Sequence, residues 1–276
     1  MVRALSLVLI SGTFAFGQGI PSPGSGQPTT AQPGGVPAIP TANVVTPQQA
    51  FAKLPADLQG HLLAWEKKTQ ALQTMYTECE REVKNTLTQK TASYKGAIRC
   101  MKPNLAYLRI DNTTKKEDFA AYICDGKFVY EYSGLDKTVT NHPIPPGGKG
   151  NVGDNLLLEF MSGAMTAADV AARFQLKLIK VDAHYVYIDV APQLAKDQQE
   201  FESLILVLYS DQVKGMEYLP AKVRMSKNKN QEVEDWTFKQ PMANPQGIKA
   251  ADFAYINPPK DWAVKKAEVG PKTTRQ

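Results

Sequence analysis

The chain has 276 residues, of which 43% are hydrophobic, 9% aromatic and 21% charged. This composition suffices for one large domain or two small ones with a hydrophobic core, and it excludes a wholly disordered chain. The formal net charge is +5, from 32 basic and 27 acidic side chains that are spread along the sequence. So small and dispersed a surplus is typical of a solvated surface, and we expect no nucleic-acid partner.

The first residues have the pattern of a signal peptide. Arg3 precedes an apolar stretch over residues 4–16, and the small residues Ala15 and Gly17 stand where a signal peptidase reads the chain. The pattern predicts a signal peptide over residues 1–17, with a buried N-terminal strand as the alternative. No cysteine directly follows the apolar stretch, which argues against lipid anchoring. We therefore expect a mature protein that is soluble and either periplasmic or secreted.

Residues 18–46 are dominated by proline, glycine, glutamine, serine and threonine. Such a segment cannot bury enough apolar surface to offset the entropy lost on ordering, so it is interpreted as a disordered linker. We expect one folded domain over residues 47–265 and a short basic tail over residues 266–276.

The folded part begins with an apolar stripe of helical period. A proline at position 55 is expected to break or start this helix, since proline is tolerated only in a first turn. The stripe is typical of a helix that packs on a sheet, and binding to a membrane surface is the alternative. Its members recur at spacings of three, four or seven: Phe51, Leu54, Leu58, Leu62, Trp65, Leu72 and Met75.

From Met75 onward the period changes to two, which predicts a β-hairpin. A turn centred between residues 89 and 90 places Cys79 opposite Cys100 and Glu80 opposite Arg99. Because both pairs are chemically sensible, this register is preferred. In an oxidising compartment it makes Cys79 and Cys100 a candidate disulfide, with three buried thiols as the alternative.

Further alternating segments predict about ten antiparallel strands, interrupted by two short helices at residues 155–161 and 166–174. Helices in so few places cannot cover both faces of one large sheet, so they are expected on a single face. The predicted fold class is therefore α+β: a curled antiparallel half-barrel of about ten to eleven strands with helices on its concave face. The predicted strands after the hairpin cover residues 105–110, 119–124, 128–132, 175–181, 185–190, 204–209, 217–225, 232–239 and 253–256.

Three motifs resemble the periplasmic lipoprotein carriers of the LolA-like family. The first is the run from Gly96 to Leu105, the second is Asp125-Gly126 with the strand after it, and the third is the ending from Ala251 to Pro259. They occur in the family's order, and the order of elements matches from about residue 47 to 265. The long linker is also similar to a planctomycete-type domain of unknown function with this fold.

The resemblance implies an eleven-strand half-barrel under a helical lid, with an apolar cavity that binds acyl chains of lipid or lipoprotein. A membrane-bound donor or acceptor protein is an implied partner. In the family, an arginine before the Pro-Asn turn holds the lid through backbone carbonyls; here that position is Lys102, which lacks the planar guanidinium. Ordinary core packing is the alternative for the candidate cavity residues, which are Leu62, Trp65, Ile98, Lys102, Leu108, Ile110, Leu156, Phe160, Trp236 and Phe238.

No motif for catalysis is found: the sequence has no nucleophile elbow, metalloprotease, dithiol or phosphate-binding loop pattern. The three histidines stand apart, so no metal site, cofactor or catalytic residue is expected. Carboxylate pairs such as Glu80 with Glu82 and Glu232 with Glu234 are interpreted as a solvated face, with a glycosidase pair left open. Two functions remain: a non-enzymatic carrier or binding protein, or an envelope interaction or sensor protein whose cavity is filled.

Overall fold

The computed structural model describes residues 46–144 and 156–267. The predicted signal peptide (1–17), all but the last residue of the predicted linker (18–46) and residues 268–276 of the predicted basic tail lie outside the described residues. None of the helices in the described part is both long and apolar enough to span a lipid bilayer.

The predicted stripe forms two helices, α1 (Pro47–Ala52) and α2 (Ala56–Ala71). A capping box at Thr46 starts α1, and Pro55 stands at the N-cap of α2, where its missing N–H costs no intrahelical bond. The stripe is therefore confirmed over α2, which buries its apolar members. Met75, the last predicted member, lies in the first strand instead.

One sheet of twelve strands forms the framework, in the order β12-β6-β5-β4-β3-β2-β1-β11-β10-β9-β8-β7. All neighbours are antiparallel except β12 and β6, and the edge strands β12 and β7 do not pair, so the sheet is open. This confirms the predicted half-barrel with a slightly higher strand count. The bounds are β1 (Thr74–Asn85), β2 (Thr91–Met101), β3 (Leu105–Asn112), β4 (Phe119–Asp125), β5 (Phe128–Ser133), β6 (Thr138–Pro143), β7 (Phe174–Val181), β8 (Tyr185–Pro192), β9 (Ser203–Tyr209), β10 (Pro220–Lys227), β11 (Glu232–Ala243) and β12 (Ala263–Lys266).

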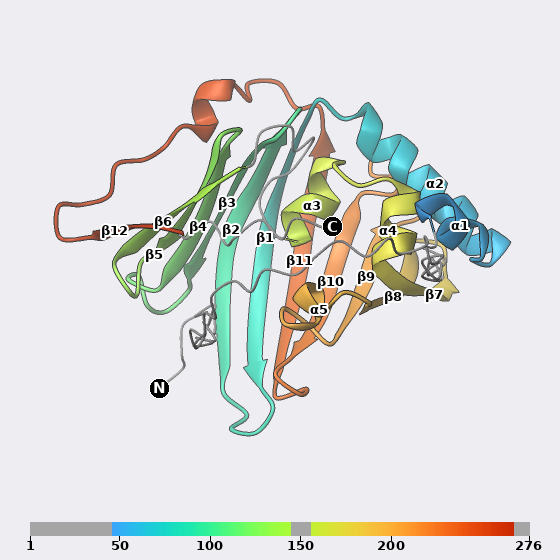
Figure 1. The fold of residues 1–276 in the computed structure, drawn as a ribbon, viewed down its shortest axis with the longest axis horizontal. Coiled ribbons are helices and arrows are strands. Elements are labelled where there is room, and N and C mark those ends of the chain that lie inside the picture. Colours follow the sequence, from blue (N-terminus) through green and yellow to red (C-terminus); the bar gives the residue numbers. More distant parts are fainter. Residues whose placement is uncertain (1–45, 145–155, 268–276) are drawn as a thin grey trace, which may run out of the picture. The chain divides into compact units, whose positions relative to one another are not determined.

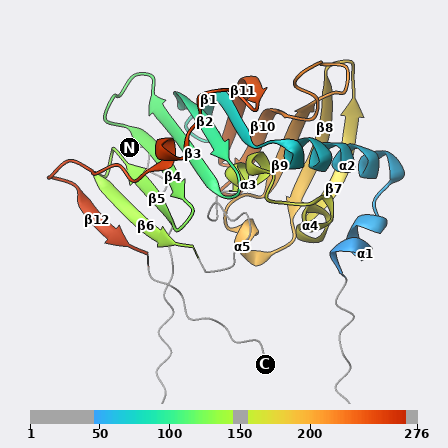
Figure 2. The ribbon, with the colours of Figure 1, turned by 90° about the horizontal axis from the view of Figure 1, so that it is seen from above.

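The α-helices lie together on one face of this sheet, as Figures 1 and 2 show. Besides α1 and α2 they are α3 (Leu156–Ser162), α4 (Ala167–Arg173) and the short α5 (Ala195–Gln198). The two predicted short helices correspond to α3 and α4, and the Thr166–Asp169 capping box starts α4. The sequence did not predict α5. The main hydrophobic core lies between these helices and the inner face of the sheet.

The register of the first hairpin differs from the prediction. Cys79 pairs with Gly96 and Cys100 pairs with Met75, so the prediction was wrong by four residues. The turn is displaced because the side chain of Asn85 accepts hydrogen bonds from the backbone of Leu87 and Thr88. A shift of four residues is about 13 Å along a strand, far beyond the reach of a disulfide. The candidate Cys79–Cys100 disulfide is therefore wrong: both cysteines are free and buried.

The end of the chain also differs from the prediction. The predicted strand over residues 253–256 is replaced by a 3₁₀ helix, η1 (Ala250–Phe253), and an extended segment. This segment packs on the outer face of the sheet, where the hydroxyl of Tyr132 donates to the carbonyl of Ile256 (2.8 Å). It continues into β12, which pairs with β6 along the sheet edge. Neither strand was predicted, because both are short and only partly apolar.

Gly96 tests the observed register. A Cβ atom at this position would lie 1.8 Å from the backbone oxygen of Arg109 on β3, so the strands must shift to admit it. We expect Gly96→Ala to lower the free energy of unfolding by about 1–3 kcal/mol. The matched control is Gly60→Ala in α2, where nothing lies within 4 Å. For Gly60→Ala we expect the free energy of unfolding to rise by about 0.5–1 kcal/mol. If urea denaturation gave the same change in unfolding free energy for both variants, it would contradict the structure.

Candidate functional site

The structure brings nine of the ten candidate cavity residues into one buried cluster between the helices and the inner face of the sheet. Each is at most 7% exposed. The ring of Trp65 on α2 meets that of Phe160 on α3 edge to face, with centroids 6.1 Å apart. The other seven are Leu62, Ile98, Leu108, Ile110, Leu156, Trp236 and Phe238.

Strand alternation explains why these residues share a face. Ile98 on β2 pairs with Leu108 on β3, and side chains two residues apart along a strand point the same way. Trp236 and Phe238 stand at the same spacing on β11, which follows β1 in the sheet. The error of four residues in the predicted register did not change which side chains face inward, because a shift by an even number of residues leaves every side chain on its own face.

A small hollow borders this cluster. At the C-terminal end of α2 there is a hollow of about 10 Å³, roughly the volume that one water needs. It is lined by residues of the α2–β1 junction, β2 and α3: Leu72, Gln73, Thr74, Met75, Cys100, Met101, Lys102, Met161 and Ser162. A larger groove of about 420 Å³ lies elsewhere, at the end of β11, and contains none of the candidate residues.

Lys102, the tenth candidate, lies beside this hollow and is half-buried. Its Nζ donates a hydrogen bond to the carbonyl oxygen of Gln70 in the last turn of α2. Its backbone N–H donates to the carbonyl of Gln73 (2.9 Å), and burial lowers the pKa of its side chain. Lys102 thus makes, with one donor, the kind of contact to a helix carbonyl that the family resemblance implied for an arginine.

Two further polar contacts hold α2 at its margins. The N–H of Ala167, at the start of α4, donates to Oε2 of Glu66 (2.8 Å). On the opposite side, Lys68 pairs with Glu217 at 2.9 Å. These contacts lie at the edge of the apolar cluster, and the buried face of α2 packs on the inner face of the sheet through Leu58, Leu62 and Trp65.

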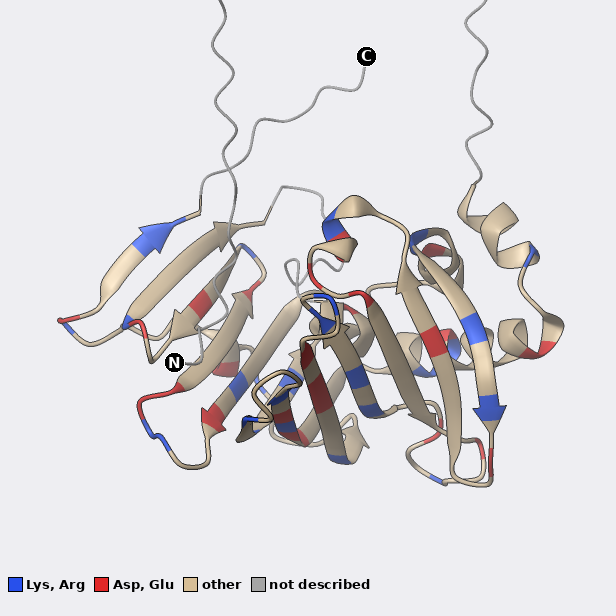
Figure 3. Cartoon of the chain, turned by 90° about the horizontal axis from the view of Figure 1, so that it is seen from below, with Lys and Arg blue, Asp and Glu red and all other residues tan. Residues whose placement is uncertain are grey.

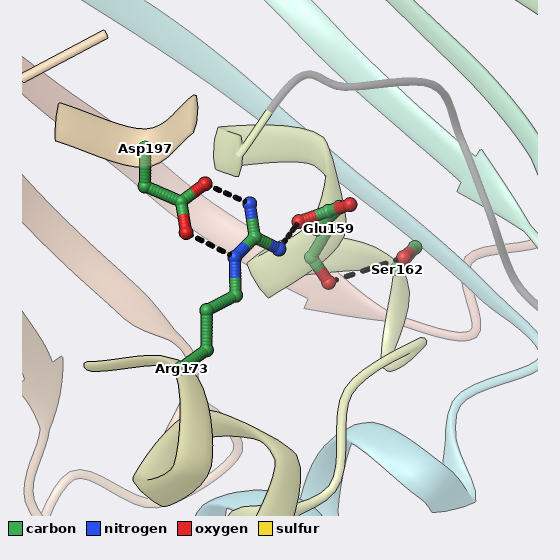
Figure 4. Close-up of polar contacts among 4 residues, drawn as sticks. All are labelled: Glu159, Ser162, Arg173 and Asp197. Carbon is green, nitrogen blue, oxygen red and sulfur yellow. Dashed lines mark hydrogen bonds and ion pairs between the residues drawn. The ribbon is translucent and has the colours of Figure 1, made fainter. Parts of the chain in front are cut away.

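One guanidinium joins three of the helices that cover the inner face. Arg173, at the end of α4, donates through Nε and Nη2 to Asp197 of α5 (2.7 and 2.6 Å) and through Nη1 to Glu159 of α3 (Figure 4). The side chains of Arg173 and Asp197 are 14% and 2% exposed. Hydrogen bonds to Asp197, and then the charge of Glu159, raise the pKa of Arg173 above its usual range. We call this group the Arg173 cluster.

A second buried ion pair lies on the inner face of the sheet, between β1 and β11. Nε of Arg81 donates to Oε2 of Glu234 (3.0 Å), and Nζ of Lys227 lies 2.7 Å from the other carboxylate oxygen. The indole N–H of Trp236 also donates to Glu234 (3.2 Å). Burial by itself would raise the pKa of Glu234, but Arg81 and Lys227 hold it at about 2. The interpretation of Glu234 as part of a solvated face was therefore wrong, since it is 2% exposed.

The three cysteines are buried in the same core and carry no sign of reactivity. Burial, with a contribution from Glu80, raises the pKa of Cys79 to about 12, and burial beside Cys124 raises that of Cys100 to about 12. Burial also raises the pKa of Cys124, whose Sγ donates to the carbonyl of Asn104 (2.9 Å). A nucleophilic cysteine needs a lowered pKa, so these thiols are core residues.

Charges of both signs alternate over the described surface, as Figure 3 shows. On the outer face Arg224 pairs with Asp235, and Lys95 and Lys239 both pair with Glu80. Within the described residues no group of three or more histidine, cysteine, aspartate or glutamate side chains could hold a metal ion. The surface therefore resembles the solvated one that the composition indicated.

The fold and the site define an open half-barrel whose inner face is covered by helices. No protein-family profile and no curated protein matches the sequence. The structure is similar to a LolA superfamily protein from Nitrosomonas europaea (10% identity, TM-score 0.37, covering 72% of this chain and 97% of that one). It is also similar to a DUF1329 family protein from Desulfovibrio piger (10%, TM-score 0.38, 78% and 98%). A third similar structure is the MucA/MucB complex from Pseudomonas aeruginosa (14%, TM-score 0.38, 72% and 60%). All three TM-scores lie below 0.4, so these similarities carry no argument about the function of this chain.

The Arg173 cluster should contribute strongly to stability. We expect Arg173→Met to lower the free energy of unfolding by about 3–5 kcal/mol, because it leaves the carboxylate of Asp197 buried without its cation. The control is Arg224→Met, which breaks an ion pair of the outer face whose arginine is 60% exposed. There we expect a loss below about 1 kcal/mol, so similar midpoints in chemical denaturation would contradict the assigned role.

The low pKa of Glu234 predicts a stability that depends on pH. Its pKa is about 2 in the folded protein and near 4.5 in the unfolded chain, so its contribution is complete above pH 4.5. As the pH falls from 4.5 towards 2, the unfolded chain takes up a proton first and the contribution is lost. Measured unfolding free energies should fall less steeply in this window for Glu234→Gln than for the wild type. Equal slopes of unfolding free energy against pH for the two proteins would refute the ion pairs of Glu234 with Arg81 and Lys227.

Proposed function

We propose that this chain is an exported, non-enzymatic carrier or binding protein for the acyl chain of a lipid or lipidated protein. The observation behind it is the apolar cluster between α2, α3 and the inner face of the sheet, which contains nine of the ten candidate cavity residues. A hydrocarbon chain can replace apolar side-chain packing, which is non-directional, without breaking directional bonds. In this proposal residues 1–17 direct export and residues 18–46 tether the folded domain.

The magnitude of chain burial constrains how such a carrier works. Burying a sixteen-carbon chain is worth roughly 13 kcal/mol, at about 0.8 kcal/mol per methylene. Release into water would then be far too slow for transport. The carrier therefore needs a membrane-bound donor or acceptor protein that displaces the helices or offers a competing apolar site.

A second candidate is an envelope interaction or sensor protein in which the interior stays filled by its own side chains. The small volume of the hollow beside Lys102, about 10 Å³, supports this alternative. The two candidates differ in one observable property, which is whether the protein takes up an acyl chain.

Native mass spectrometry of the full chain, purified after export, separates the two candidates. A carrier is expected to retain lipid or to take up a fluorescent fatty-acid probe. A protein that is empty and ignores such probes would overturn the carrier and leave the second candidate.

The exchange rate of the same fatty-acid probe tests the contact between Lys102 and Gln70 beside the hollow. We expect Lys102→Met to speed exchange about fivefold, because it removes the hydrogen bond to the Gln70 carbonyl. Lys102→Arg should slow exchange, since a guanidinium offers more donors to the same helix end. The control is Lys222→Met, at an exposed lysine of β10. Exchange rates that do not depend on residue 102 would contradict the role of Lys102.

A further inference from the structure

Trp65 carries a buried polar atom that has no hydrogen-bond partner among the described residues. Its side chain is 2% exposed, and its indole Nε1 has no hydrogen-bond acceptor among the described residues. The two other buried side-chain atoms without a hydrogen bond in the described part are oxygens, on Asn141 and Glu234. The Glu234 oxygen faces Arg81 and Lys227 in ion pairs, so Trp65 Nε1 is the donor that needs an explanation.

The other buried tryptophan of the inner face shows the usual arrangement. Trp236 is 7% exposed and donates its indole N–H to Glu234 (3.2 Å). Buried tryptophans generally find such a partner, because an unpaired buried N–H loses its bonds to water and gains nothing in return. The hydroxyl of Thr69, one turn on, donates to the backbone carbonyls of Trp65 and Glu66, and it makes no hydrogen bond with the indole.

The position of this donor points to a ligand. Trp65 lies in the middle of α2, between the helix and the apolar inner face, and packs against Phe160 of α3. The hollow at Leu72 lies seven residues further along the same helix, about 10 Å from Trp65. A chain that entered by this hollow would run beneath α2 towards the indole.

We propose that Trp65 Nε1 donates to the carbonyl oxygen of a bound acyl chain. This inference rests on the proposed function and deepens it, since it names the polar group that the interior recognises. Among the described residues Nε1 has no acceptor. A carbonyl-bearing chain supplies one, whereas a plain hydrocarbon of equal length does not, so the N–H of Trp65 strengthens the binding of the first and leaves that of the second unchanged.

The test compares two ligands that differ in the carbonyl group. Methyl laurate and tetradecane have chains of similar length, and their affinities are measured by displacement of a neutral apolar dye from the full chain. We expect Trp65→Phe to lower the ratio of ester to tetradecane affinity about tenfold, by weakening the ester alone. Tetradecane binding in the same variant controls for the loss of ring volume.

Each outcome has one meaning. If the wild type binds neither ligand, the proposed function fails and this inference fails with it. If it binds both ligands and the ratio of their affinities is the same in Trp65→Phe, only this inference is overturned. Should that variant not fold, benzothienylalanine at position 65 keeps the ring size without the N–H, and the same comparison decides.

The source of the carbonyl is then identified with a diacyl phospholipid and a diacylated lipopeptide of equal chain length. The compound whose affinity falls about tenfold in the variant is the one whose carbonyl meets Trp65. If neither affinity falls, the inference is overturned for natural acyl chains.

Discussion

The whole arrangement depends on one constraint, which is that the apolar inner face of an open sheet must be covered. Ile98, Leu108 and Phe238 lie on that face and are at most 2% exposed. Left uncovered, such a face would be a large exposed apolar patch, which soluble proteins avoid. The stripe of α2 and the bulky residues of α3 provide the cover, and their contacts with the sheet form the main hydrophobic core of the described residues.

Alternation along the strands predicted the faces correctly but not the partners. The candidate residues of β2 and β3, which are Ile98, Leu108 and Ile110, are all buried, although the register of the first hairpin was wrong by four residues. The period of two decides the face, while the turn decides the pairing. That turn depends on the side chain of Asn85 and on the positive φ of Gln89, neither of which alternation detects. A disulfide inferred from pairing was therefore the least secure prediction.

Contacts between distant residues were the other part that sequence reasoning missed. Arg81 and Glu234 are 153 residues apart, and the sequence does not show that these two side chains pair. A signal did exist, since Glu234 stands two residues before Trp236 and four before Phe238, on the face predicted to be apolar. The parallel pairing of β12 with β6 left no such signal, because each strand is short and partly polar.

The polar contacts around the cover differ greatly in strength, and this difference determines which part can separate first. The Arg173 cluster joins α3, α4 and α5 through one buried guanidinium and two carboxylates, so breaking it costs several kcal/mol, on the order of the 3–5 typical of buried pairs. The last turn of α2 is held by two lysines instead: Lys102 donates to the carbonyl of Gln70, and Lys68 pairs with Glu217. Both lysines are partly exposed, so each of these contacts contributes less than a buried ion pair does. The cover is therefore held more strongly across α3, α4 and α5 than at the C-terminal end of α2.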